Sequence, residues 1–273
     1  MSSKPQPEPE NENHSQRFDL AAFESDVDSL AASAGFAKHE IWQDGLGHAI
    51  NLWTKESATP DAPSILISAG MHGDEPAGPL ALLELFKNYP FSEQFEWLLT
   101  PVLNPTGLLQ GTRENASGID QNRDFLLRQS PEIKAYTNWW ESHRTACALH
   151  LSLHEDWETD GYYFYAINSS QLPCYSKELQ QILSKKIPLQ QTGPVDDHEL
   201  AAPGLIVHPC EADEPEGWPE AIWLTKSHPT LSYTFEAPSS HPLEDRVKGL
   251  ETCLKVALDR SHAALVDCSS QAG

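Results

Sequence analysis

The sequence has few basic residues and no long apolar run, and both shortages narrow what the protein can bind. It contains 18 lysines and arginines against 40 aspartates and glutamates, a formal net charge of −22. Such a charge repels nucleic acid phosphates and anionic membrane surfaces. No window approaches the ~18 consecutive apolar residues of a membrane-spanning helix, and residues 1–16 lack the apolar stretch of a signal peptide. The sequence therefore predicts a cytoplasmic protein that binds neither nucleic acid nor membrane.

Cysteine is also scarce. The chain has five cysteines, an odd number, and no two of them form the close CxxC pair of a zinc ribbon or a disulfide oxidoreductase. They are Cys147, Cys174, Cys210, Cys253 and Cys268. We expect reduced thiols rather than a disulfide framework.

The composition supports one globular unit. Hydrophobic residues make up 39% of the 273 positions, which is enough for one sizeable core. Residues 1–16 are rich in proline, glutamate and asparagine and predict a disordered acidic tail. We expect a single catalytic domain over residues 17–267 and a flexible C-terminus over residues 268–273.

Hydrophobic periodicity alternates between strands and helices along the chain. Asp19 is a plausible N-cap for a first helix that Gly35 ends. Buried strands are predicted near residues 49–53, 65–67, 95–103, 146–153, 161–166 and 230–235. Helices are predicted between Pro76 and Pro90, from Pro131, near residues 175–185, and from Leu243. This order predicts an α/β fold with three α/β/α layers and a mixed, largely parallel central sheet.

Several residues that can bind a metal follow the ends of predicted strands, where ligand sites form in sheets of this kind. His72 and Glu75 follow one strand, His154 ends another, and Glu236 ends a third. Two imidazoles and a carboxylate suit catalytic zinc, because three protein ligands leave a fourth position for water. We expect His72, Glu75 and His154 to bind zinc and Glu236 to act as general base and acid.

The spacing alone is a weak signal. A His and a Glu three positions apart often lie together by chance on a solvated surface. His150 lies four residues before His154, and one of this pair is expected to be a core or supporting histidine. We favour His154 as the ligand because it lies at the end of the strand.

Residues 104–125 make the pattern specific. The chain carries, in order, HGDE at 72–75, NPTG at 104–107, Arg113-Glu-Asn, GIDQNRDF at 118–125, LHED at 153–156 and TFEAP at 234–238. This series resembles the zinc carboxypeptidase family, which is related to the succinylglutamate desuccinylase and aspartoacylase branch.

The resemblance implies a role for each matching residue. His72, Glu75 and His154 match the ligands of one zinc ion, and Glu236 matches the catalytic glutamate. Arg113 matches the arginine that polarises the scissile carbonyl. Asn122 and Arg123 match the pair that holds the terminal carboxylate of the substrate. An alternative for both arginines is a surface salt bridge in a very acidic protein.

The sequence departs from the family pattern at two places. No tyrosine lies between Tyr175 and Tyr233, where the pancreatic-type enzymes carry a mobile tyrosine. Tyr162, Tyr163 and Tyr165 are the candidates to replace it, although alternating aromatic residues in a strand usually serve packing. Ser152 stands where related sequences often carry an aspartate that supports the third ligand.

The predicted function is zinc-dependent cleavage of a peptide or amide bond next to a free carboxylate, in a small peptide or acyl amino acid. One alternative is an N-acyl amino acid amidohydrolase of the succinylglutamate desuccinylase type. That branch carries a further domain after its catalytic glutamate, whereas only enough chain for one helix follows Glu236 here. A second alternative is a non-catalytic carboxylate-binding protein, against which the retained Glu236 and Arg113 argue.

Two further features stay open at the level of sequence. His208, Asp74, Glu155 and Asp156 could hold a second metal ion, although the resemblance requires only one. The acidic stretch Glu211–Glu220 could be a lid that selects basic substrates, or simply a solvated loop.

Overall fold

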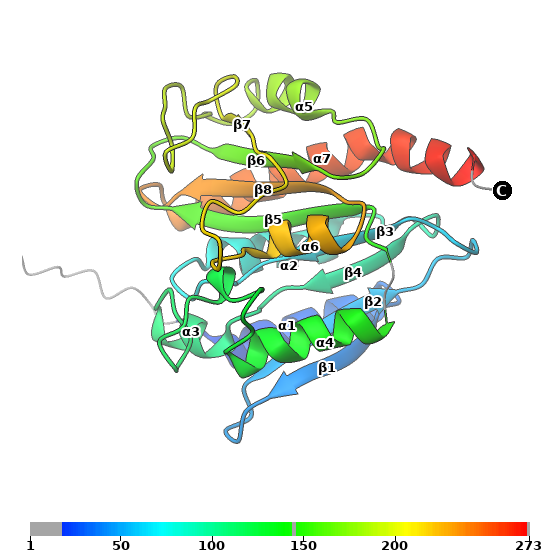
Figure 1. Cartoon of the computed structure of the whole chain (residues 1–273). Coiled ribbons are helices and arrows are strands. Elements are labelled where there is room, and N and C mark those ends of the chain that lie inside the picture. Colours follow the sequence, from blue (N-terminus) through cyan, green and yellow to red (C-terminus); the bar gives the residue numbers. More distant parts are fainter. Residues whose placement is uncertain (1–17, 144–145, 272–273) are drawn as a thin grey trace, which may run out of the picture.

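The structure, a computed structural model, describes residues 18–143 and 146–271, so the predicted N-terminal tail lies outside the described residues. These residues build one eight-stranded sheet in the order β1-β2-β4-β3-β5-β8-β6-β7 (Figure 1). The strands are β1 Ala37–Gln43, β2 Ala49–Lys55, β3 Ser64–Ser68, β4 Glu96–Thr100, β5 Leu149–Asp156, β6 Tyr163–Asn168, β7 Leu205–Val207 and β8 Leu231–Pro238.

The sheet is mixed, with a parallel centre. β4, β3, β5 and β8 run parallel to one another. The pairs β1–β2, β2–β4 and β6–β8 are antiparallel, and β7 runs parallel to β6. The carboxyl ends of the four central strands therefore meet at one edge of the sheet. This edge carries the candidate site.

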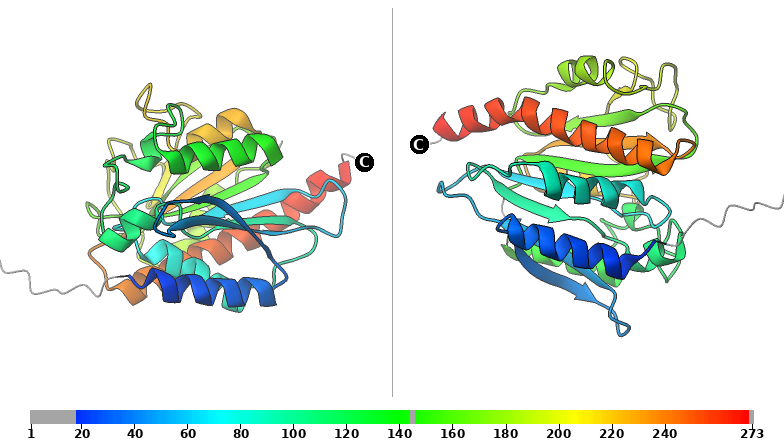
Figure 2. Two further views of the ribbon diagram at one scale, coloured as in Figure 1. Left: turned by 90° about the horizontal axis from the view of Figure 1, so that it is seen from below. Right: turned by 180° about the vertical axis from the view of Figure 1, so that it is seen from behind.

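Helices cover both faces of the sheet, and each face has its own hydrophobic core. The helices are α1 Leu20–Ser33, α2 Ala77–Asn88, α3 Pro105–Gln110, α4 Pro131–His143, α5 Ser176–Leu183, α6 Glu220–Ser227 and α7 Leu243–Gln271. α1, α2, α5 and α7 pack into the larger core, whereas α4 and α6 pack into the core on the opposite face (Figure 2). The predicted three-layer α/β/α fold is confirmed.

The predicted elements and the observed ones agree where the hydrophobic pattern is long. The Asp19 side chain caps α1 by accepting a hydrogen bond from the Ala22 amide, at 3.0 Å. The pattern missed β1, α3, β7 and α6. β7 has only three residues, and α6 begins at Glu220, the last residue of the acidic stretch for which the sequence allows either a lid or a solvated loop.

The ends of the chain and its thiols add two observations. α7 extends to Gln271, past residue 267, where the sequence placed the end of the domain. Cys147, Cys174, Cys210 and Cys253 form no disulfide. Within residues 18–143 and 146–271, no helix combines the length and hydrophobicity needed to cross a bilayer.

Candidate metal centre and active site

The loop that follows β3 places His72 and Glu75, and glycines shape it. Gly70 has a φ of 61°, a left-handed conformation that favours glycine. A β-carbon at Gly73 would collide with the backbone of Gly107, in the NPTG segment. The loop is also fixed by the Gly73 amide, which donates to the Thr112 carbonyl at 2.9 Å. The backbones of the HGDE and NPTG motifs are thus in direct contact with each other.

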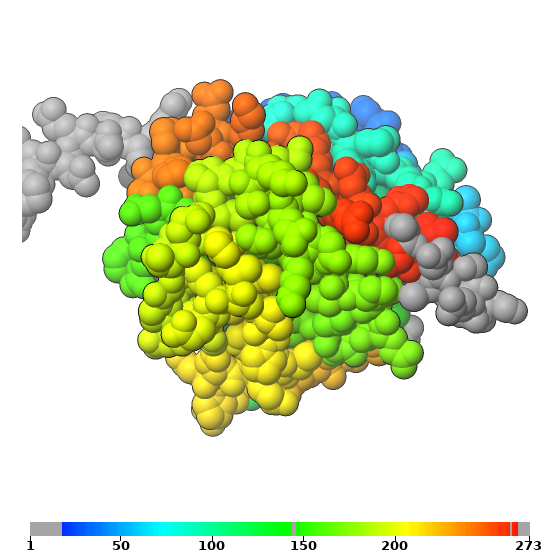
Figure 3. Space-filling model, turned by 90° about the horizontal axis from the view of Figure 1, so that it is seen from above, coloured from blue at the N-terminus to red at the C-terminus, as the bar shows by residue number. Residues whose placement is uncertain are grey.

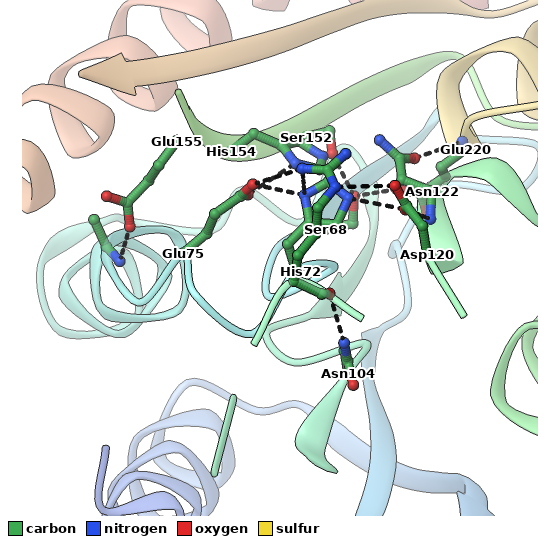
Figure 4. A network of polar contacts seen from close by, with 12 residues as sticks. Ser68, His72, Glu75, Asn104, Asp120, Asn122, Ser152, His154, Glu155 and Glu220 are labelled. Carbon is green, nitrogen blue, oxygen red and sulfur yellow. Dashed lines mark hydrogen bonds and ion pairs between the residues drawn. The ribbon is translucent and has the colours of Figure 1, made fainter. Parts of the chain in front are cut away.

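His72, Glu75 and His154 converge, as Figure 4 shows. Nδ1 of His72 lies 2.6 Å from one carboxylate oxygen of Glu75, and Nδ1 of His154 lies 3.0 Å from the other. All three side chains are buried, and their candidate ligand atoms lie within 4.8 Å of one another. His154 reaches this point because Ser152, two residues earlier on β5, is in register with Ser68 at the end of β3.

The charges of the three residues are strongly coupled. Burial disfavours protonation of His72, but the charge of Glu75 and a hydrogen bond to Asp120 outweigh burial and raise the pKa of His72 to about 9. Burial likewise disfavours the Glu75 carboxylate, yet the two histidines lower the pKa of Glu75 to about 2. Two imidazoles and a carboxylate at this spacing fit the donor set of a catalytic zinc site.

Arg113 and Asp120 complete the environment of His72. Nε of Arg113 donates to Asp120 at 3.0 Å, and its Nη1 lies 3.3 Å from Nδ1 of His72. The other oxygen of Asp120 lies 3.2 Å from Nε2 of His72. The sequence reasoning passed over Asp120, although it lies within the GIDQNRDF motif. It orients both the imidazole and the guanidinium.

His150, the rival of His154, belongs to a buried polar network instead. Its Nδ1 lies 2.9 Å from the hydroxyl of Ser232, and its Nε2 lies 3.2 Å from that of Ser68 and 3.4 Å from a carboxylate oxygen of Glu220. Glu220 also accepts hydrogen bonds from Ser68 at 2.6 Å and from Tyr136 at 2.7 Å. His150 has partners on both ring nitrogens and does not face the Glu75 carboxylate.

The same network includes Ser152, whose role the sequence left in doubt. The Ser68 hydroxyl lies 3.2 Å from that of Ser152. Ser152 therefore takes part in the network of His150 and Glu220, although its side chain also lines the cavity described below. The ring of His154 forms its hydrogen-bond contact with Glu75 instead.

Asn122 and Arg123 lie in a short 3₁₀ turn, Gln121–Arg123, beside the start of α6. The amide oxygen of Asn122 accepts a hydrogen bond from the Glu220 backbone at 3.1 Å, which leaves its NH₂ group as a donor. Arg123 is exposed and donates to the Asn122 carbonyl at 3.0 Å. Within the described residues Arg123 forms no ion pair with a carboxylate, whereas Arg113 does.

One cavity of about 660 Å³ unites these residues. His72, Glu75, Arg113, Asn122, Arg123, His154 and Glu236 all line it. Glu236 is in register with His154 on β5 and with Tyr163 on β6. Burial, and then the nearby charges of Glu75 and Asp156, raise the pKa of Glu236 well above its ordinary value.

The three candidate tyrosines lie in two different environments. Tyr163 and Tyr165 line the cavity, where the Tyr163 hydroxyl donates to Asp156 at 3.2 Å. The Tyr162 hydroxyl donates instead to the Asp245 carbonyl at 2.8 Å, against α7. Tyr163 and Tyr165 thus keep the place suggested from sequence, and Tyr162 does not.

The structure does not bring together the four residues suggested for a second metal. Glu155 is buried, accepts a hydrogen bond from the Ala77 amide at 2.6 Å and pairs with Arg246. Asp74 is exposed. His208 lies instead with His198 and Asp213, a group that sequence reasoning missed because its members come from separate loops.

Comparisons with known proteins bear on the fold and the class of this chain. Residues 61–184 match the model of the succinylglutamate desuccinylase/aspartoacylase catalytic domain. The chain is 33% identical over 98 residues to carboxypeptidase SOL1 of Arabidopsis thaliana, a match that covers 28% of this chain and 20% of that relative.

Solved structures extend the similarity over nearly the whole chain. A candidate metallopeptidase from Shewanella denitrificans OS217 is 27% identical with a TM-score of 0.75, and the match covers 90% of this chain and 91% of that one. Carboxypeptidase A of Helicoverpa armigera shares the fold, with a TM-score of 0.62 at 16% identity over 88% of this chain and 71% of that one. The fold and the similarities define a hydrolase of the carboxypeptidase type. In sequence and fold the chain is similar to the zinc carboxypeptidase-like family, and it spans about a fifth of the length of the curated relative it matches.

Proposed function

We propose that the protein is a zinc-dependent hydrolase that cleaves a peptide or amide bond next to a free carboxylate. The observation that carries the proposal is the convergence of His72, Glu75 and His154 on a cavity that Glu236 and Arg123 also line. A structural zinc site is usually closed by four protein ligands. Here three candidate ligands meet at a cavity of about 660 Å³, within the size range of small-molecule sites.

The chemistry follows from the side chains around this point. Zinc held by the three residues would lower the pKa of a bound water molecule toward neutrality. Glu236 accepts the proton of the attacking water and returns it to the leaving nitrogen, and its raised pKa makes it a stronger base than a solvated glutamate. The Arg113 guanidinium, beside His72, stabilises the negative charge that develops on the carbonyl oxygen.

Arg123 supports the preference for a free carboxylate. In a chain of formal charge −22, an arginine is expected to find an acidic partner. Arg123 lines the cavity and forms no ion pair within 4.0 Å among the described residues, although its charge acts on Asp120. Asn122, whose NH₂ group is a donor, precedes it in the chain and also lines the cavity. A guanidinium and an amide suit bidentate binding of a carboxylate.

A second candidate is hydrolysis of N-acyl amino acids, which the match of residues 61–184 to the succinylglutamate desuccinylase/aspartoacylase domain favours. Both candidates use the same metal, base and carboxylate contacts. They differ only in the acyl side of the substrate.

The test is a hydrolysis assay with a panel of peptides and N-acyl amino acids, with and without a metal chelator. We expect turnover that the chelator abolishes and zinc restores. Glu236→Gln should lower kcat by about 10²–10⁴ without loss of bound zinc. Glu84→Gln, at a half-buried position of α2 outside the cavity, is the control. Full zinc-dependent turnover by Glu236→Gln would contradict the proposed base.

A further inference from the structure

A second group of metal-binding side chains lines the same cavity and shares no residue with the first. His198 lies in the connection between β6 and β7, His208 directly follows β7, and Asp213 lies between β7 and α6. Figure 3 looks onto the side of the molecule that carries β7 and α5, where the yellow-green and yellow segments lie side by side. The candidate ligand atoms of the three residues lie within 4.8 Å of one another.

A tight turn holds His198 in place. Val195 and His198 pair through two backbone hydrogen bonds of 3.0 and 2.8 Å, and the two residues between them, Asp196 and Asp197, have φ angles of 47° and 61°. Left-handed backbone at both central positions is typical of a two-residue hairpin turn. The Tyr165 hydroxyl fixes the turn by donating to Asp196 at 2.9 Å.

The ring nitrogens of both histidines face one carboxylate. Nε2 of His198 lies 3.4 Å from Asp213, and Nε2 of His208 lies 3.3 Å from each oxygen of Asp213. Ligand atoms around a tetrahedral zinc ion, with bonds of about 2.1 Å, lie about 3.4 Å apart. The observed separations match this spacing.

The other nitrogen of His208 fixes its tautomer. Nδ1 lies 2.7 Å from the Pro209 carbonyl oxygen, which can only accept a hydrogen bond, so Nδ1 carries the proton. In neutral His208 the lone pair of Nε2 then faces the Asp213 carboxylate, and two acceptors repel each other. A cation between them removes the repulsion. A metal-binding histidine commonly donates its second N–H to a backbone carbonyl in this way.

Aromatic packing restricts both rings further. The rings of His198 and His208 lie 4.8 Å apart, and the Tyr165 ring packs edge-on against both, at 5.7 and 5.9 Å. His208 is buried, whereas the Asp213 side chain is 66% exposed. The packing therefore holds the two histidine rings in place, whereas the carboxylate of Asp213 stays accessible to solvent.

We propose that His198, His208 and Asp213 form a second metal site, for Zn²⁺ or a similar ion such as Co²⁺ or Ni²⁺. Two imidazoles and one carboxylate suit these ions better than Mg²⁺ or Ca²⁺, which prefer oxygen ligands. The metal joins the β6–β7 connection to the segment after β7 across the mouth of the cavity. All three residues line the cavity in which we propose that substrate binds.

The experiment counts metal ions on the full chain after chelation, reloading with Zn²⁺ and desalting. The wild type should retain about two zinc ions per chain, and His198→Gln and Asp213→Asn should each retain about one. Because Asp213 is largely exposed, Asp213→Asn removes a ligand without disturbing packing. His48→Gln is the matched control, since His48 pairs with Asp44 at 2.7 Å without a third ligand, and it should retain two.

Variants of the first group separate this proposal from the proposed function. His72→Ala should lose a different zinc ion, and the combination of His72→Ala with Asp213→Asn should retain none. Zinc at a hundred times its dissociation constant should make opening of residues 195–213 about 100-fold rarer, measured by hydrogen exchange, and Mg²⁺ should have no effect. A wild-type count of one that His72→Ala reduces to none, or an unchanged count in both His198→Gln and Asp213→Asn, would overturn the second site and identify the group as an ion pair.

Discussion

His150 and His154 provide a matched pair that tests the whole assignment of the first metal site. Both are fully or almost fully buried on β5, four residues apart. His154→Ala removes a nitrogen that faces Glu75, so the variant should bind one zinc ion fewer than the wild type. His150→Ala should bind the same number as the wild type, but it should be much less stable.

The size of the stability loss follows from the contacts of His150. The alanine variant loses contacts with two serine hydroxyls and leaves the buried Glu220 carboxylate without the imidazole of His150. Removal of one partner from a buried pair destabilises a protein by about 3–5 kcal/mol. At about 2 °C per kcal/mol for a chain of this size, Tm should fall by roughly 6–10 °C. His154→Ala, measured without metal, also takes an imidazole from a buried carboxylate, because Nδ1 of His154 lies 3.0 Å from Glu75, and it should be destabilised by a similar amount. The metal count therefore separates the two variants.

The assay combines metal analysis of desalted protein with thermal unfolding in the presence of chelator. Ser232→Ala is a milder test of the network, because it removes a single hydroxyl partner of His150 and should be destabilised by about 1 kcal/mol. The assignment is refuted if His150→Ala loses a zinc ion that His154→Ala retains. It is also refuted if both variants keep all their metal.

Three further predictions concern the same cavity. Arg123→Ala should raise KM for substrates with a free carboxylate by about tenfold or more and leave kcat nearly unchanged, whereas amidated substrates should show no difference. Arg113→Ala should lower kcat by about 10²–10³, and an effect confined to KM would argue against a role in the transition state. Because the pKa of metal-free His72 is raised to about 9, zinc binding at pH 7 should release at least about one proton. The apparent affinity should then rise with pH until about pH 9; calorimetry in buffers of different ionisation enthalpy measures the release, and a buffer-independent heat would contradict it.

The positions of the buried and charged groups also explain why the two histidines of β5 differ. His150 lies inside the sheet layer, where Ser68, Ser232 and Glu220 satisfy its ring and Glu220 is in turn held by Tyr136. The negative charges of Glu75 and Asp120 are instead compensated by imidazole and arginine groups that face the cavity. Only the second arrangement can exchange a proton for a metal ion without breaking the core.

The sequence determined the layered α/β fold and the content of the first site. Long hydrophobic periodicity located α1, α2, α4 and α7 and the central strands, because burial of a whole face leaves a regular pattern. His72 and Glu75 were predictable because they follow β3 within one short loop. The motif series added Arg113, Asn122 and Arg123 as neighbours.

Only the tertiary structure decided which residues share a site when they come from distant segments. Spacing could not choose between His150 and His154, since the choice depends on how far each lies along β5 relative to β3 and β8. It also could not join His198 to Asp213, because a turn with two left-handed aspartates and the pairing of β7 with β6 bring them together. Short strands and loops carry little hydrophobic pattern, so their side chains meet through pairing and packing that a linear reading does not contain.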